Sequence, residues 1–596
     1  MQKPLIVVSY KSEGSEDAAL RKLAGWMGVE TKTIALADDS DAVAQINSGT
    51  FAPHRIALSA DTLAALDRSL PDSAAFRKFL ETSCESVLVF GCASKPEHEE
   101  SIRRLTEGRI PHIESATRSV TGATIEFPSA NRAISQQFAD LDFIEQNEVI
   151  HSVFAPDESG GIMLADGKPV FLSISRGACS IFLLAGIHVP DVDQPASREK
   201  GREKSYASLI PFLLFLRSAF GQSCWHGTRK TARLIIDDPL LNDSYGWLEY
   251  SRLFASMQKQ RFGATIAFIP WNHRRTSKRW TKRTLAENHN FSICIHGCDH
   301  TNREFSSGDS LLLEQKAGLS LTRLAQHEQR TRMPFEKVMV FPQGHFSKAG
   351  IRALARNHYL AAVNTTCFPT DSEPDELRIR DFLRPAVTRF EGFPLFERHY
   401  PKRLIDFAFD LFLGKPAFIV EHHPYFEDGG AALEKFVQEL YKIEPNLSWP
   451  ALTSQIERSC LLRRCNDTEC DVKFFTRIFV LENEQSTKAR FHLEKENVTD
   501  VQVVFVDGEQ AQFALDGTTL KLELELEPGQ SRKIEVVDEP KQPVARRNFG
   551  LSYNVRVLLR RELSEFRDNT LSKHPGILQA AKRIAKSLRV TGDRKN

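Results

Sequence analysis

The stretch that decides the fold is FSICIHGCDHTNREF, which runs from Phe291 to Phe305. Its alternating first half is typical of a strand, and Gly297 ends the alternation. His296 stands where the strand ends, and His300 follows four residues later. Histidines four residues apart can lie on one side of a helical turn and so face one ion. Two unrelated surface histidines in a loop are the alternative interpretation.

Three further apolar runs end in the same manner. The run in ARLIIDDPLLND ends at Asp237 and Asp238, the run in KVMVFPQGH passes into Pro342 and Gly344, and the run in PAFIVEHHPYF ends at His422 and His423. The carboxyl ends of parallel strands in a barrel converge on one face, which hosts active sites. We therefore expect these side chains to meet there, although each could also be an ordinary turn.

The order of these motifs resembles the polysaccharide deacetylase family, the metal-dependent carbohydrate esterases with a NodB-homology fold. The resemblance covers about residues 226–460 and implies a distorted (β/α) barrel. It implies that Asp237 is the catalytic base and that Asp238, His296 and His300 are the metal ligands. It also implies a late histidine as general acid; His423 is the first choice because it directly precedes proline, and His422 is the second.

One motif departs from the family pattern. The third motif of the family carries an arginine that orients the base, but this chain reads VMVFPQGH with Val340 near the expected place. Orientation of the base must then come from elsewhere in the chain, or the chemistry differs.

Two imidazoles and one carboxylate leave open positions on a divalent cation, and zinc is the expected ion. Such an ion lowers the pKa of water from about 15.7 toward 7. The predicted function is metal-dependent hydrolysis that removes an acyl (acetyl) group from an amino sugar or glycan precursor. The alternatives are a non-catalytic glycan-binding or regulatory scaffold, and a glycosidase or other carbon–nitrogen hydrolase on a related barrel.

The stretch ATIAFIPWNHRRTS supplies candidate substrate contacts. Trp271 could stack on a sugar ring, and Asn272 and Arg274 could bind polar groups of the substrate. Pro342 and Gly344 belong to a further loop expected on the same face. An ordinary solvated basic loop is the alternative for residues 271–275.

The remaining sequence predicts a multidomain α/β protein. With 596 residues, the chain exceeds what one hydrophobic core supports. Alternating strand and helix patterns predict a parallel, Rossmann-like α/β domain over residues 1–120. Residues 121–225 read as a strand-rich extension and a helix, residues 226–460 as the barrel, residues 466–540 as a β-sandwich, and residues 541–596 as a basic helical tail.

Charge separates the tail from the rest of the chain. The whole chain has a formal net charge of +1, which predicts no nucleic-acid partner, and no apolar run is long enough to span a bilayer. The expected location is the cytoplasm. Residues 546–596 carry thirteen Lys and Arg against four Asp and Glu, a net of +9. Within them, residues 577–589 have the pattern of a basic amphipathic helix, which fits either peripheral contact with an anionic membrane or packing on the acidic remainder of the protein.

Overall fold

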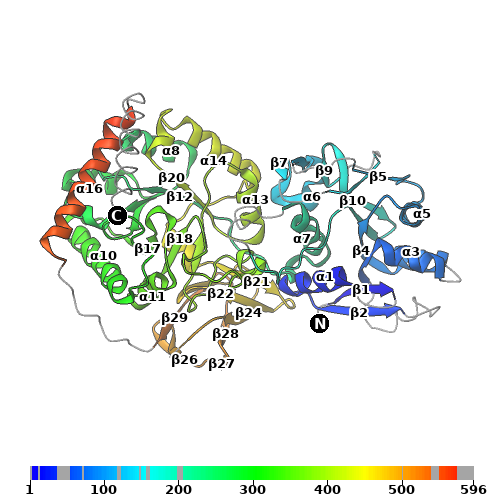
Figure 1. Cartoon of the computed structure of the whole chain (residues 1–596). Helices are drawn as coiled ribbons and strands as arrows, with labels where there is room; N and C mark the ends of the chain where they lie inside the picture. Colours follow the sequence, from blue (N-terminus) through cyan, green and yellow to red (C-terminus); the bar gives the residue numbers. More distant parts are fainter. Residues whose placement is uncertain are drawn as a thin grey trace, which may run out of the picture.

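The computed structural model describes residues 3–10, 14–36, 54–69, 73–116, 122–145, 150–155, 161–196, 206–499, 501–538 and 549–573. Figure 1 shows a central barrel in green and yellow, with an N-terminal α/β unit on one side and a β-sandwich below it. The predicted helix over residues 577–589 lies outside the described residues.

The barrel is a nearly closed sheet of seven parallel strands in the order β19-β18-β17-β16-β15-β12-β20. A parallel bridge between His399, just after β19, and Ile419 of β20 connects the two edge strands. This bridge brings the segment after β19 beside β20 and one strand away from β12. The strands are β12 (Ala232–Asp237), β15 (Ala264–Phe268), β16 (Phe291–His296), β17 (Glu336–Val340), β18 (Ala361–Asn364), β19 (Leu395–Glu397) and β20 (Ala417–Glu421).

Helices connect successive barrel strands and bury amphipathic faces against the outside of the sheet. The longest, α10 (Ser310–Thr331), begins at Asp309, whose side chain accepts a hydrogen bond from the Leu312 N–H. The other helices of this unit are α8 (Tyr250–Gln260), α9 (Lys278–Glu287), α11 (Lys348–Arg356), α12 (Ile379–Phe382), α13 (Leu404–Leu413), α14 (Ala431–Ile443) and α15 (Leu452–Glu457). Short 3-10 turns follow three of the strands: η4 (Pro270–Asn272), η5 (Pro342–Gly344) and η6 (His423–Phe426).

The N-terminal unit has one continuous nine-stranded sheet, in the order β2-β1-β3-β4-β11-β10-β9-β6-β7. Its first five strands are parallel and the rest pair antiparallel. The predicted boundary at residue 120 therefore falls within a single sheet, because β11 pairs with β4 across it. The strands are β1 (Leu5–Tyr10), β2 (Thr31–Leu36), β3 (His54–Ser59), β4 (Cys84–Cys92), β6 (Ala123–Glu126), β7 (Asp142–Glu145), β9 (Met163–Ala165), β10 (Lys168–Arg176) and β11 (Cys179–Ala185), with β5 (Ile113–Ser115) and β8 (Ser152–Phe154) as a separate pair.

Helix α7 (Tyr206–Phe220) joins this unit to the barrel. Its Phe212 packs on Phe90 of β4, while Tyr206 packs on Phe409 of α13. A helix that is apolar all round is buried on both sides. This burial explains the apolar run LIPFLLFL at residues 209–216 of the helix. The other helices of the unit are α1 (Ser15–Trp26), α3 (Ala60–Ser69), α4 (Ser73–Thr82), α5 (Pro96–Leu105) and α6 (Arg132–Ser135).

The region after the barrel is a β-sandwich of a five-stranded and a four-stranded sheet. Alternating side chains of both sheets form a separate apolar core that includes Phe474, Phe491 and Ile534. Its strands are β21 (Cys460–Arg464), β22 (Glu469–Phe474), β24 (Ala489–Lys495), β28 (Thr519–Leu526) and β27 (Ala514–Asp516) in one sheet, and β23 (Ile478–Glu482), β29 (Ser531–Asp538), β25 (Val501–Val506) and β26 (Glu509–Ala511) in the other.

The last described element, α16 (Leu551–Asn569), returns to the barrel, where Figure 1 shows it in red beside α10. Its contacts are with the loops that follow barrel strands: Tyr245 after β12, Arg275 after β15, Asp299 after β16 and His423 after β20. Helix α16 therefore lies on the face where the carboxyl ends of the strands meet. No helix among the described residues has the length and apolarity needed to cross a bilayer.

Candidate metal and catalytic site

Strand alternation points four of the site's side chains into the barrel. The barrel interior is an apolar cluster that includes Ile235 of β12, Cys294 of β16, Phe396 of β19 and Phe418 of β20. Successive side chains of a strand point to opposite faces, so residues separated by an even number share a face. Asp237, His296 and Arg398 each lie two residues after one of these inward side chains, and His422 lies four residues after Phe418. All four therefore point inward at the strand ends.

Asp238, His296 and His300 converge on one point. Oδ1 of Asp238 lies 3.2 Å from Nε2 of His296 and 2.9 Å from Nε2 of His300. The same oxygen is buried and has no partner with hydrogen-bond geometry among the described residues. One carboxylate oxygen and two ring nitrogens thus face one another, and the buried oxygen lacks a hydrogen bond. An oxygen and two imidazole nitrogens are a donor set that suits a divalent cation.

The second ring nitrogen of His296 is held in place by the backbone. Nδ1 of His296 lies 3.1 Å from the carbonyl oxygen of Val340. Since a carbonyl can only accept, the ring donates from Nδ1, and the neutral ring keeps Nε2 unprotonated toward Asp238. Outer-shell hydrogen bonds of this kind fix the tautomer and orientation of metal-binding histidines. Val340, which replaces the expected arginine, thus contributes through its main chain.

Glu304 shapes the loop that brings His300 back to His296. Its buried carboxylate accepts hydrogen bonds from the N–H groups of Cys298, Asp299 and His300 and pairs with Lys316 at 2.8 Å. His300 itself has φ of +54°, and Asp238 has φ of +81°. Such backbone conformations are uncommon outside glycine and cluster at functional sites, where the surroundings hold them.

Asp237 is held by an arginine that the sequence motifs did not identify. Nη1 and Nη2 of Arg398 donate to its two carboxylate oxygens at 2.7 and 2.6 Å, and both side chains are buried. Burial raises the pKa of Asp237, but the Arg398 guanidinium, together with His296 and His422, more than offsets this, so the pKa lies below its usual range. Arg398 directly follows β19, whereas the family pattern predicts an arginine on β17. The sequence signal for Arg398 is its position two residues after Phe396, which puts both side chains on the same face of the strand.

The two late histidines point in different directions. His422 is 39% exposed, and its Nε2 lies 4.0 Å from Oδ2 of Asp237. His423 instead packs edge-on against Tyr245, with its Nε2 3.6 Å from Asp568 of α16. The residue near Asp237 is therefore His422 and not the first choice, His423. Alternation from Phe418 gives the reason, since His422 shares the inward face.

The candidate substrate contacts lie on loops at the same end of the barrel, but they differ in how deeply they are buried. Trp271 is half-buried, and the Arg323 guanidinium stacks on its ring at 5.0 Å. Asn272 is buried, whereas Arg274 is exposed. The loop of η5 holds Pro342, which is buried, and Gly344, whose φ is +71°. A role for these five residues in substrate binding stays a prediction.

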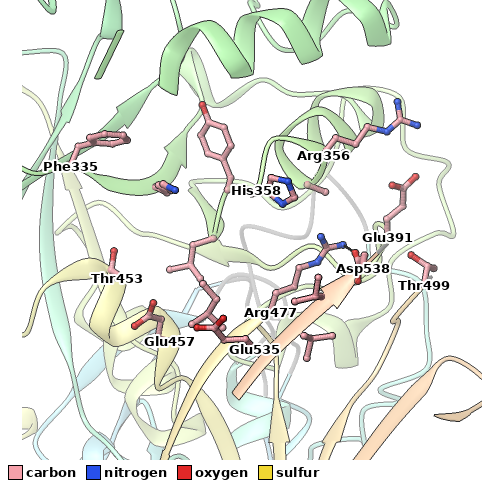
Figure 2. Close-up of a pocket in the computed structure, with 17 residues that line it drawn as sticks. Phe335, Arg356, His358, Glu391, Thr453, Glu457, Arg477, Thr499, Glu535 and Asp538 are labelled. Carbon is pink, nitrogen blue, oxygen red and sulfur yellow. Dashed lines mark ion pairs between the residues drawn. The ribbon is translucent and has the colours of Figure 1, made fainter. Parts of the chain in front are cut away.

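A cavity of about 400 Å³ lies away from this cluster, between the barrel and the β-sandwich. Figure 2 shows residues from both units around it, including Phe335 and His358 from the barrel and Arg477 and Glu535 from the sandwich. Phe335 immediately precedes β17, so this is the end where the barrel strands begin. The cavity is therefore at the opposite end from the converging carboxylates and histidines.

Comparisons with known proteins find matches among solved structures only. No family model and no curated protein matches the chain. Among solved structures, the carbohydrate deacetylase Agd3 matches 91% of this chain and 99% of its own at 9% identity and a TM-score of 0.44. A family 4 carbohydrate esterase from Streptomyces lividans, in complex with acetate, matches 38% of this chain and 94% of its own at 12% identity and a TM-score of 0.24.

A third matching structure, a CE4-family pseudoenzyme from Bacillus anthracis, covers 39% of this chain and 66% of its own at 14% identity and a TM-score of 0.25. These identities and scores are too low to assign a function to the chain. The assignment rests on the geometry of its own site.

Proposed function

We propose that this protein is a metal-dependent hydrolase that removes an acyl group, such as acetyl, from an amino sugar or glycan precursor. The observation that carries the proposal is the convergence of Asp238, His296 and His300 beside the Asp237–Arg398 pair. The metal would be held by the first three residues, and zinc suits one oxygen and two imidazole nitrogens. The bound ion supplies Lewis acidity toward water and the acyl oxygen.

Asp237 would serve as the base. Its lowered pKa keeps it a carboxylate at neutral pH, so it can accept the proton of the attacking water. The bidentate contact with Arg398 fixes the carboxylate plane and leaves the remaining lone pairs of the oxygens to face the water.

His422 would serve as the acid that protonates the leaving amine or alcohol. It is close to Asp237 and partly exposed, so it can reach a substrate that enters from solvent. The nearby Tyr400 ring lies parallel to it, with centroids 6.4 Å apart, and restricts its orientation. Trp271, Asn272, Arg274, Pro342 and Gly344 are the proposed carbohydrate contacts on the same face.

Incubating the metal-loaded protein with acetylated glycan fragments tests the proposal. Release of acetate without new reducing ends supports an acyl hydrolase, whereas new reducing ends would indicate a glycosidase. Binding of the fragments with neither product would indicate a glycan-binding module. Asp237→Asn is the matched control, because it keeps the three metal ligands and removes the proton acceptor.

A further inference from the structure

Helix α16 has its polar side against the protein and its apolar side toward solvent. Its buried residues include Arg561, Glu565 and Asp568. Six large apolar side chains on the other side are 46–82% exposed: Leu551, Val555, Leu558, Leu559, Leu563 and Phe566. An ordinary surface helix has the reverse arrangement. At 100° per residue, these six side chains cover about 140° of the helix circumference, and we call this surface the apolar arc.

The buried polar side ties α16 firmly to the loops around the candidate site. Asp568 accepts a hydrogen bond from the Tyr245 hydroxyl at 2.8 Å, and its neighbour Asn569 accepts one from the Gly246 N–H at 2.7 Å. Glu565 pairs with Arg275 through both guanidinium nitrogens. The outward apolar arc is therefore a consequence of specific polar contacts, and rolling the helix to bury the arc would break them.

We propose that this arc docks α16 onto an anionic lipid bilayer. Arg556, Arg560 and Arg567 line one edge of the arc, within about 40° of one another at 100° per residue. The sequence that follows the described part, residues 574–596, adds six Lys and Arg against one Asp. An apolar face flanked by basic side chains suits the interface of a bilayer with negative headgroups. Glu562, the acid within the arc, lies 3.4 Å from Arg275.

A second copy of the chain fits this surface less well. The arc is roughly 22 Å long and 10 Å wide, or about 220 Å², whereas a stable interface needs about 800 Å² from each partner. Two copies would also bring their basic edges and basic C-terminal segments together.

Docking through α16 would place the strand ends that carry the candidate metal cluster near the bilayer surface, because α16 contacts the loops after β12, β15, β16 and β20. The proposal does not depend on hydrolysis, so its test and the test of the proposed function can fail separately.

The test is co-sedimentation of the full-length protein with two kinds of vesicle, phosphatidylcholine alone and phosphatidylcholine with about one third phosphatidylglycerol. We expect binding to the anionic vesicles only, weakened by salt. The combined variant Leu558→Gln, Leu559→Gln, Leu563→Gln should reduce the affinity by about tenfold or more, since each leucine loses apolar burial in the interface. These side chains are exposed, and glutamine is a good helix former, so the variant should keep the wild-type melting temperature.

A matched control is the combined variant Ile144→Gln, Leu515→Gln, Val537→Gln, whose side chains are also exposed but lie outside α16. It should bind vesicles as the wild type does. Equal binding by the α16 variant and the wild type, or no binding by the wild type, would overturn the proposal. A wild-type dimer that the α16 variant converts to monomer, with no vesicle binding, would overturn it in favour of a second copy.

Discussion

Two clusters in this barrel combine histidine with carboxylates, and they differ in their source of positive charge. In the first, Oδ1 of Asp238 faces the Nε2 atoms of His296 and His300, and no lysine or arginine pairs with Asp238 among the described residues. In the second, Asp410 lies 3.0 Å from His399 and 2.9 Å from the Lys415 ammonium, which also lies 3.2 Å from Glu397. In the second cluster, the Lys415 ammonium therefore already supplies a positive charge to the two carboxylates.

Residue types alone would therefore make both of these clusters candidate metal sites, whereas the charges favour the first. A buried carboxylate must be paired, either with a protein cation or with a bound ion. An aspartate-to-asparagine substitution should therefore affect turnover at the first cluster and stability at the second.

The largest expected effect on turnover follows from Asp237→Asn. Loss of the proton acceptor should lower kcat by about 10²–10⁴-fold with the metal retained. The corresponding change in the second cluster, Asp410→Asn, should leave kcat within a few-fold and act on stability, because it leaves Lys415 with one buried carboxylate fewer. Steady-state acetate release and the melting temperature of both variants measure the contrast. Wild-type turnover by Asp237→Asn would show that the role of base is wrongly assigned.

Arg398→Met should cost stability as well as turnover. Removing one partner of a buried pair leaves Asp237 uncompensated, at about 3–5 kcal/mol. A matched control is Arg384→Met, since Arg384 also contacts a carboxylate through both terminal nitrogens, that of Glu496, but the pair is partly exposed. That loss should be about 0–1 kcal/mol. Urea unfolding followed by tryptophan fluorescence compares the two, and equal losses would contradict the special status of the Asp237–Arg398 pair.

His422→Ala should lower kcat by about 10²-fold through loss of the general acid. His423→Ala should have a smaller effect on turnover, since its ring contacts Tyr245 and Asp568 of α16. The two single variants share strand end and chemistry, so each controls for the other. A larger loss in His423→Ala would restore the assignment that its position before proline suggests.

The smallest effect concerns Glu421, which is paired in the sheet with Ile236. Burial raises its pKa to about 7, although the His422 N–H and Lys402 oppose the shift. Between the unfolded pKa near 4.5 and the folded value near 7, the folded state holds a proton that the unfolded state has lost. The stability that Glu421 contributes is thus complete below about 4.5 and is lost as pH rises through 7.

Glu421→Gln removes this titration. The melting temperature of the wild type should fall relative to that of the variant between about pH 5 and pH 8. A difference that stays constant with pH would show that Glu421 titrates normally.

The barrel could be predicted from the sequence because its strands are apolar runs with polar ends. Asp238, His296 and His300 were identified as a set, and the structure brings them together. The arginine beside Asp237 was missed because chain order places the family arginine on β17, at Val340. Here Arg398 reaches Asp237 only after the bridge between His399 and Ile419 connects the barrel edges, which is a tertiary event.

Strand alternation favours His422 over His423, whereas the position before proline favours His423. The orientation of α16 could not have been predicted in this way. Its pattern shows two faces, and polar contacts such as those of Asp568 with Tyr245 and of Glu565 with Arg275 decide which face is buried. Side chains that meet across long sequence distances decide the other two features, the position of Arg398 and the orientation of α16.

Metal content of the purified protein tests the central claim most directly. The protein is equilibrated with zinc, freed of unbound ion and submitted to elemental analysis. We expect one zinc ion per chain in the wild type and in His399→Ala. His296→Ala should give none while keeping its fold, as followed by circular dichroism. Full metal retention by His296→Ala, or loss of the ion in His399→Ala alone, would contradict the account.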